Sequence, residues 1–262
     1  PISLLKGIDY SLKKECKYNG RKIVIRLLLP FFCLLNRSIM KLQILADYSA
    51  LSKTTANLII DYIKRKPDSL ICLASGHTPI GVFQELEKAV QQNQVDLSKC
   101  TFLSLDEWVN IDPSDPGSCL SMLKKDCFAP LGIGANQVEF FDVSVSDLQK
   151  ECDRINALIE SRGGLDIMLV GVGTNGHIGM NEPGTSFKSY AHISELAEET
   201  KSVGQKYFQK NTSLSLGITL GLNHLREAKL PIVMANGTKK AAIIAKGLQG
   251  IATEEIPLSV VH

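Results

Sequence analysis

Short apolar runs alternate with amphipathic segments along most of this chain of 262 residues. The runs at Leu70–Ala74 and Leu165–Val170 are typical of strands buried on both faces of a parallel sheet. Residues 50–65 and 145–161 place apolar side chains at helical spacing, and Pro79 is suited to open a further helix. Strands that alternate with such helices predict right-handed crossovers. The predicted fold class is therefore α/β: a single-domain, open, mostly parallel sheet with helices on both faces, Rossmann-like in its layers.

Residues 1–39 differ from the rest of the chain in charge and hydropathy. They hold eight Lys or Arg against two Asp or Glu, which leaves 21 basic and 25 acidic residues over 40–262. Their apolar stretch, Ile23–Leu35, is too short for a membrane-spanning helix of about 20 residues. We predict that 1–39 are a basic, apolar N-terminal extension outside the fold, and we favour an upstream segment without function over a targeting signal. Residues 40–262 then form the domain.

The overall charge and the cysteines narrow the function classes. A formal net charge of +2, with a mildly acidic body, predicts neither a nucleic-acid-binding stripe nor a membrane-binding polybasic surface. The seven cysteines show no C-x-x-C and no zinc-ligand spacing, which suits reduced thiols in a cytoplasmic protein. We therefore expect no nucleic-acid partner, no membrane partner and no metal.

Three predicted strands end in unusual residues, and ligands of open parallel sheets bind beyond such strand ends. The first is followed by Ser75-Gly76-His77-Thr78-Pro79, which leads into a helix. The two hydroxyls and the free N–H groups at the helix start are suited to a phosphate. The segment is neither a Walker A loop nor a G-x-G-x-x-G fingerprint, so nucleotide binding is not indicated. Because a tight turn needs glycine in any case, this turn alone favours binding and packing equally.

The second strand end carries two adjacent carboxylates, Asp106 and Glu107, followed by Trp108. A carboxylate held near an apolar strand end can act as a proton-abstracting base, because burial raises its pKa. The alternative is a solvated or ion-paired acid, which the pair by itself does not exclude.

The third strand end carries a glycine-rich loop, GVGTNGHIGMNEP, which begins at Gly171. Four glycines in nine residues permit backbone conformations that other residues avoid. The loop displays Asn175, His177 and Glu182, so an amide and a carboxylate flank an imidazole and can fix its tautomer. A lone histidine is usually structural, but one in this setting is more often functional.

These motifs together resemble one known family. LDEWV, GVGTNGHIGMNEPGTSF and SGHTP are similar to segments of the glucosamine-6-phosphate deaminases, also called isomerases, and the resemblance covers 40–262. The related 6-phosphogluconolactonases lack the Asn-Glu-Pro continuation seen here at 181–183. The resemblance implies a sugar-phosphate isomerase type of fold. It also implies that a hexosamine phosphate is converted to fructose 6-phosphate and ammonia without metal or organic cofactor.

The resemblance also implies roles for matching positions. Asp106 would be the base that moves a proton from C2 to C1 through an enediol-type intermediate. His177 would assist ring opening, oriented by Glu182 and Asn175. The phosphate would be bound by Lys240, Lys206, Ser75, Gly76 and Thr78.

Several departures leave alternatives open. Some relatives have Asp at the position of Asn175, and some have Arg at the position of Lys206. Allosteric members bind an activator phosphate with Arg and Lys where this chain has His192 and Ser194, so we predict that this activator site is missing. Family members continue past His262 into a further strand, so we expect one sheet edge to be short.

The substrate and the function class also have alternatives. Galactosamine 6-phosphate, giving tagatose 6-phosphate, is a credible substrate beside glucosamine 6-phosphate. A 6-phosphogluconolactonase-like hydrolase and a non-catalytic sugar-phosphate sensor are the competing functions. The sequence does not decide between a monomer and a homo-oligomer.

Overall fold

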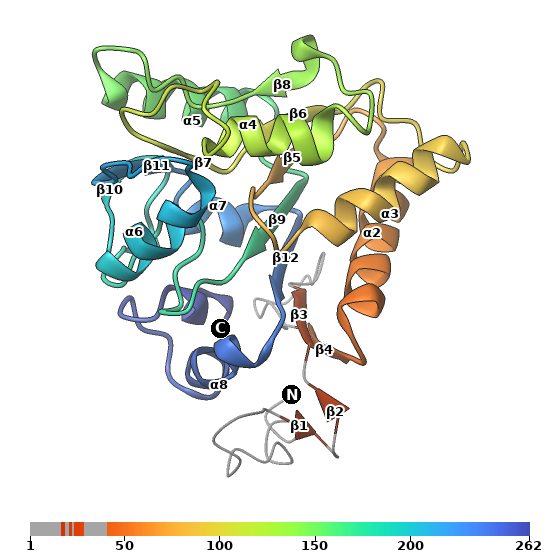
Figure 1. The fold of residues 1–262 in the computed structure, drawn as a ribbon. Coiled ribbons are helices and arrows are strands. Elements are labelled where there is room, and N and C mark those ends of the chain that lie inside the picture. The colour runs from red at the N-terminus through yellow and green to blue at the C-terminus, as the bar shows by residue number, and fades with distance from the viewer. Residues whose placement is uncertain (1–16, 19–20, 23, 29–40) are drawn as a thin grey trace.

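A seven-stranded sheet forms the centre of the computed structural model, which describes residues 17–18, 21–22, 24–28 and 41–262 (Figure 1). From one edge to the other its strands are β4 (Lys41–Leu45), β3 (Val24–Leu28), β12 (Leu230–Ala235), β9 (Ile167–Gly171), β5 (Leu70–Leu73), β6 (Thr101–Ser104) and β8 (Val138–Glu139). The five strands from β12 to β8 run parallel, whereas β3 is antiparallel to both of its neighbours. The predicted open, mostly parallel sheet is confirmed.

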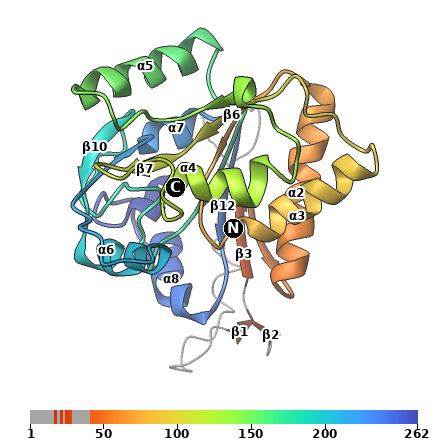
Figure 2. The same cartoon turned by 45° about the horizontal axis from the view of Figure 1, so that its top comes forward.

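Helices cover both faces of this sheet (Figures 1 and 2). One face packs against α2 (Tyr48–Arg65), α3 (Ile80–Gln91), α4 (Cys119–Leu123) and its π-helical continuation η1 (Lys124–Phe128). The other packs against α5 (Leu148–Ser161), α7 (Leu222–Glu227), α8 (Ala241–Gln249) and the 3₁₀ turn η5 (Pro257–Val261). Two short 3₁₀ turns, η2 (Ala135–Gln137) and η4 (Thr238–Lys240), precede β8 and α8. The helices predicted over 50–65 and 145–161 are thus present.

Strand β5 shows why its sequence is an unbroken apolar run. Leu70 and Cys72 point into the cluster beneath α5, α7 and α8, whereas Ile71 and Leu73 point into the cluster beneath α2 and α3. All four side chains are buried. Because successive side chains of a strand alternate between faces, a strand covered on both sides must be apolar at every position.

Strand β3 differs from the expectation that residues 1–39 stay outside the fold. Its five residues hydrogen-bond in register to β12 on one side and to β4 on the other. Strand β12 would otherwise present its backbone N–H and C=O groups unpaired at that edge, which is costly for a buried strand. The remainder of the extension is β1 (Lys17–Tyr18), paired with β2 (Arg21–Lys22), and residues outside those described.

A second, antiparallel sheet of three strands adjoins the first. It consists of β10 (His192–Glu195), β11 (Leu216–Thr219) and β7 (Asp106–Trp108). Strands β6 and β7 are separated only by Leu105, whose N–H still bonds to β5 and whose C=O accepts from Leu220. The chain therefore passes directly from the large sheet into the small one, and Asp106 is the first residue after the change.

At the amino ends of the central strands of the large sheet, a buried carboxylate joins four elements. Oδ2 of Asp166 accepts from Lys66 Nζ at 2.6 Å and from the backbone N–H of Leu70 at 2.9 Å. Its Oδ1 accepts from Lys229 Nζ at 3.0 Å and from the hydroxyl of Tyr62 at 3.2 Å. Burial raises the pKa of Asp166, but the bonds from Lys66, Leu70 and Lys229 outweigh it and hold this pKa below its usual range. The group links the end of α2 to the starts of β5, β9 and β12.

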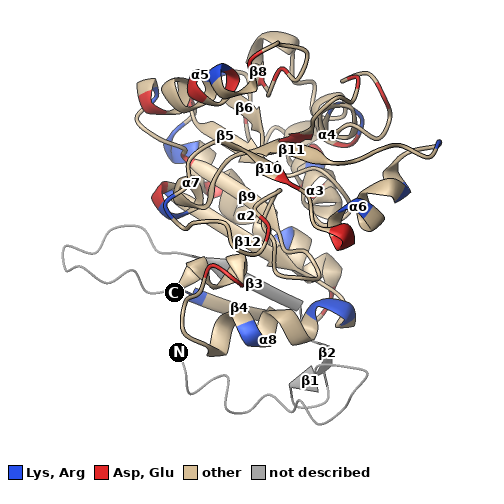
Figure 3. Ribbon diagram, turned by 90° about the vertical axis from the view of Figure 1, so that its left-hand side faces the viewer, with Lys and Arg blue, Asp and Glu red and all other residues tan. Residues whose placement is uncertain are grey.

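Acidic and basic residues are interspersed on the surface, for example on α5, α6 and α7 (Figure 3). On α5, Arg154 bonds to Glu151 at 2.8 Å and to Glu139 at 3.2 Å. None of the helices in the described residues is both long and apolar enough to cross a membrane.

Candidate active site

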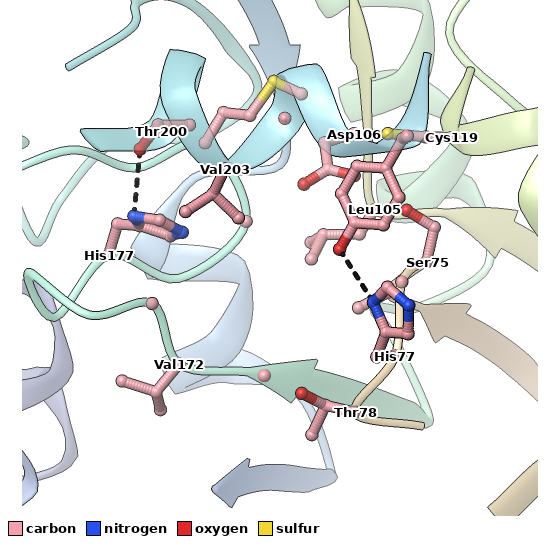
Figure 4. A pocket seen from close by; sticks show the side chains of 18 of the residues that line it. Ser75, His77, Thr78, Leu105, Asp106, Cys119, Val172, His177, Thr200 and Val203 are labelled. Carbon is pink, nitrogen blue, oxygen red and sulfur yellow. Dashed lines mark hydrogen bonds between the residues drawn. The ribbon is translucent and has the colours of Figure 1, made fainter. Parts of the chain in front are cut away.

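A cavity of about 200 Å³ lies beyond the carboxyl ends of β5, β6 and β9 (Figure 4). The position is the one expected for ligands of an open parallel sheet. Six of the nine site residues proposed from the sequence line it: Ser75, Gly76, Thr78, Asp106, His177 and Lys240. Asn175 and Glu182 lie behind His177, and Lys206 lines a neighbouring hollow of about 440 Å³.

Asp106 is the buried carboxyl of the cavity. Burial raises its pKa to about 7, the Cys119 thiol lowers it as a hydrogen-bond donor, and the charge of Glu107 raises it. Figure 4 shows Asp106 and His177 on opposite sides of the cavity, both pointing into it. A carboxyl with this pKa accepts a proton in its ionised form and returns it readily near neutral pH, as a general base must.

Glu107 has a structural role that explains the adjacent carboxylates. Oε1 accepts from the backbone N–H groups of Trp108 and Cys119, each at 2.9 Å, and Oε2 accepts from that of Leu120 at 2.9 Å. These bonds satisfy free N–H groups at the start of α4 and hold the start of that helix next to β7. The loop between Val109 and Ser118 returns the chain to β7. The carboxylate that caps α4 therefore lies well before that helix in the sequence.

His177 is held from several sides. Its ring Nδ1 lies 3.1 Å from Oγ1 of Thr200 and 3.7 Å from Oε2 of Glu182. Burial lowers the pKa of His177, the Glu182 charge raises it and the charge of Lys240 lowers it, with a net decrease. The imidazole is therefore neutral at pH 7. Gly173 lies directly beneath the ring, where a Cβ would collide with it, so this position requires glycine.

Asn175 orients the loop rather than the imidazole ring. Its Oδ1 accepts the backbone N–H of His177 at 3.1 Å, and its Nδ2 donates to Oε2 of Glu182 at 3.0 Å. The expected group of Asn175, His177 and Glu182 is thus together, with the amide bonded to the carboxylate.

The turn after β5 and one lysine form the polar floor of the cavity. Gly76 has a φ of +84°, and a Cβ there would come within 3.0 Å of the Tyr207 hydroxyl. Lys240 lies at the start of α8, and burial lowers its pKa. Hydroxyls, backbone N–H groups and a half-buried cation together suit an anion such as a phosphate. Among the described residues, no group of three His, Cys, Asp or Glu side chains could hold a metal ion.

Two residues of the site were not found from the sequence. Thr200 is on α6 (Glu198–Gly204), and Tyr207 is on the 3₁₀ turn η3 (Gln205–Tyr207) that follows it. The Tyr207 ring stacks on His77 with centroids 5.5 Å apart, and its hydroxyl lies 3.4 Å from His77 Nδ1. Lys206 precedes Tyr207 but lies on the other side of it, which explains why Lys206 is outside the main cavity.

Fold and site together define an open-sheet α/β protein with an acid–base site at the carboxyl ends of its strands. Such a site suits proton transfer on a small polar substrate. The chain belongs to the family described as glucosamine-6-phosphate isomerases/6-phosphogluconolactonase, which matches residues 46–262.

Individual relatives agree with this assignment. The chain is 36% identical over 224 residues to the glucosamine-6-phosphate deaminase of Geobacillus sp. (strain WCH70), covering 85% of this chain and 89% of the relative. It is 34% identical over 224 residues to glucosamine-6-phosphate deaminase 1 of Bacillus subtilis (strain 168), covering 85% and 93%.

Solved structures show the same fold. A monomeric glucosamine-6-phosphate deaminase superposes with a TM-score of 0.76 at 32% identity, covering 82% of this chain and 90% of that one. The 6-phosphogluconolactonase of Trypanosoma brucei superposes with a TM-score of 0.64 at 17% identity, covering 82% and 88%. The second likeness concerns the fold alone.

Proposed function

We propose that this protein is an amino-sugar-phosphate deaminase/isomerase. It converts glucosamine 6-phosphate to fructose 6-phosphate and ammonia, or galactosamine 6-phosphate to tagatose 6-phosphate. The observation that carries the proposal is the buried Asp106 carboxyl, which faces the neutral His177 across one cavity. The names of the relatives support it.

The proposed reaction assigns one step to each group. His177 assists opening of the sugar ring at its ring oxygen. Asp106 takes the proton from C2 and returns it to C1 through an enediol-type intermediate. Water then adds at C2, and the C2–N bond breaks to release ammonia. The reaction therefore needs a base, an acid for the ring oxygen and an anchor for the phosphate, with no organic cofactor.

The phosphate anchor in this proposal is the floor of the cavity. Lys240 supplies the charge, and the turn with Ser75, Gly76 and Thr78 supplies hydroxyl and N–H donors. Lys206 would reach the phosphate only if η3 shifts, because it now faces the neighbouring hollow. A cytoplasmic location is part of the proposal, supported by the free, buried cysteines of the described residues.

Release of ammonia from each of the two sugar phosphates by the wild-type protein tests the function. Hydrolysis of 6-phosphogluconolactone is measured in parallel, because that activity belongs to the competing function. Ammonia from either sugar supports the proposal and identifies the epimer. If the lactone is hydrolysed and neither sugar yields ammonia, the lactonase function replaces the proposed one. If the sugars bind without turnover, the result favours a non-catalytic sugar-phosphate sensor.

The pH dependence of kcat/KM is expected to have an acidic limb with a midpoint near pH 7. The base is active when ionised, and burial raises the pKa of Asp106 to about 7. Below this midpoint the rate should fall about tenfold per pH unit, as expected for a single protonation. Measurement of kcat/KM across a pH series in one set of buffers determines this midpoint. A midpoint near pH 4, the ordinary range of an exposed carboxyl, would contradict the buried base.

Replacing Lys240 by glutamine is expected to raise KM about 10- to 100-fold, because a charge-assisted bond to phosphate contributes about 1.5–3 kcal/mol. Steady-state kinetics of the purified variant measure this change. Lys239 is the matched control, since it is exposed and does not line the cavity. Equal effects of Lys239→Gln and Lys240→Gln would show that only the overall charge matters.

A further inference from the structure

The hydroxyl of Thr200 holds the active-site imidazole from outside the glycine-rich loop. Thr200 lies in the first turn of α6, is 5% exposed, and places Oγ1 at 3.1 Å from Nδ1 of His177 (Figure 4). Thr200 is 23 residues from His177 along the chain, and the later α6 residues Val203 and Gly204 line the same cavity. The element that covers the cavity therefore also contacts the imidazole.

No other described side chain is within hydrogen-bond distance of Nδ1. Oε2 of Glu182 is 3.7 Å away and already accepts from Asn175 Nδ2 at 3.0 Å. Oε1 of Glu182 is buried and has no hydrogen-bond partner among the described residues. If Nδ1 carried a proton, this carboxylate would be the stronger acceptor, because charge-assisted bonds are shorter and stronger than neutral ones. The ring lies closer to the hydroxyl, which favours an Nδ1 that accepts.

We propose that Thr200 is a positioning residue that donates to Nδ1 of His177 and thereby places the proton of the neutral imidazole on Nε2. The second ring nitrogen points into the cavity (Figure 4). An Nε2–H can donate to the ring oxygen of a bound sugar phosphate, which is the acid role that the proposed function requires. The acid role of this Nε2–H rests on the proposed function. The tautomer of His177 does not, because it can be measured in the protein without substrate.

One consequence concerns α6. Because Thr200 and the cavity-lining Val203 are on the same short helix, His177 receives its donor only when α6 lies over the cavity. With α6 displaced, Glu182 is the nearest acceptor for the ring, and the proton moves to Nδ1. The position of α6 over the cavity and the tautomer of His177 are then determined together.

Thr200→Val tests the assignment, since it removes the hydroxyl and keeps the shape. We expect kcat to fall about 10- to 100-fold with KM changed less than about threefold, a loss of the size seen when the orienting partner of a metal-bound histidine is removed. Thr200→Ser should restore kcat to within about threefold. Thr55→Val is the matched control, because Thr55 is a fully buried helix threonine whose hydroxyl has no partner among the described residues.

The second readout is the tautomer, measured from the ¹⁵N shifts of His177 in the protein without substrate. We expect Nε2–H in the wild type and in Thr200→Ser, and Nδ1–H in Thr200→Val. An Nδ1–H wild type, or a Thr200→Val variant with unchanged tautomer and kcat, overturns the proposal. Loss of activity that serine does not restore also overturns it, in favour of a packing role. Wild-type protein that releases no ammonia would refute the proposed function, while the NMR result would still decide on Thr200.

Discussion

Asp106→Asn is expected to lower ammonia release by about 10²–10⁴-fold, the range for loss of a general base. An amide has the same shape but cannot accept the proton from C2. KM should change little, because the variant leaves the proposed phosphate anchor, the turn with Ser75 and Lys240, untouched. Initial rates at saturating sugar phosphate measure the effect. Full activity in this variant would mean that another group is the base.

The same variant should not be destabilised, which separates chemistry from folding. Burial raises the pKa of Asp106 to about 7, so the folded state binds the proton more tightly than the unfolded chain. Stability from this group is complete at low pH and is lost as pH rises through about 7. At pH 8 the ionised carboxyl opposes folding and the neutral amide does not. Asp106→Asn should therefore melt at the same or a higher temperature at pH 8.

Asp112→Asn is the control for Asp106→Asn. Asp112 lies in the loop that follows β7, accepts from Ser114 and does not line the cavity. We expect its activity to equal that of the wild type. A comparable loss in both variants would point to a general effect of removing an acidic group from this segment.

Asp166→Ala is expected to destabilise the protein by about 3 kcal/mol, the low end for breaking a buried ion pair. The low end applies because the Lys66 and Lys229 side chains are each 34% exposed and regain water when the carboxylate is removed. The buried N–H of Leu70 loses its partner, which adds to the cost. For a chain of this size the melting temperature should fall by about 6–12 °C.

Asp61→Ala is the control, since Asp61 is exposed on the same helix as Tyr62. The pKa of Asp166 is lowered in the fold, so its contribution is present above the ordinary carboxyl pKa and is lost as pH falls through the lowered value. The difference between the variant and the wild type should therefore shrink in acid. A wild-type melting temperature in Asp166→Ala at pH 7 would contradict the structural role of this group.

The sheet could be predicted because its strands are decided by local composition. Leu70–Leu73 is apolar at every position, a pattern typical of a strand covered on both faces. Strand β10 was not predicted, because its four residues alternate between exposed and covered and include a histidine and a glutamate. Helix α6, EETKSVG, is short and mostly polar, so it lacks an apolar stripe. Strand β3 was assigned to an extension because β12, the partner that joins it to the parallel strands, lies far along the chain.

The residues of the candidate site also differ in whether local sequence could predict them. His177 and Asp106 could be found because each follows an apolar strand, and strand ends of a parallel sheet meet at one edge. Thr200 could not, because its contact with His177 depends on how α6 packs. Lys206 was placed with the phosphate ligands on a motif position, whereas the 3₁₀ turn directs it to the neighbouring hollow. Only five residues separate Thr200 from Lys206 in the sequence. Tertiary packing alone brings Thr200 to His177 and directs Lys206 away from the main cavity.

The alternation of strand β7 limits how this region can vary in length. Asp106 and Trp108 line the cavity, whereas Glu107 between them holds the start of α4. Loss or gain of one residue ahead of the pair would exchange the two faces, so that the Glu107 side chain would enter the cavity and the Asp106 side chain would point to α4. Insertions are instead better tolerated between 110 and 116, where the loop lies at the surface. Gly117 is excluded, because it is buried and its C=O accepts from the Trp108 indole N–H at 3.2 Å. Homologous chains can therefore diverge in loop length here while the spacing of the acidic pair stays fixed.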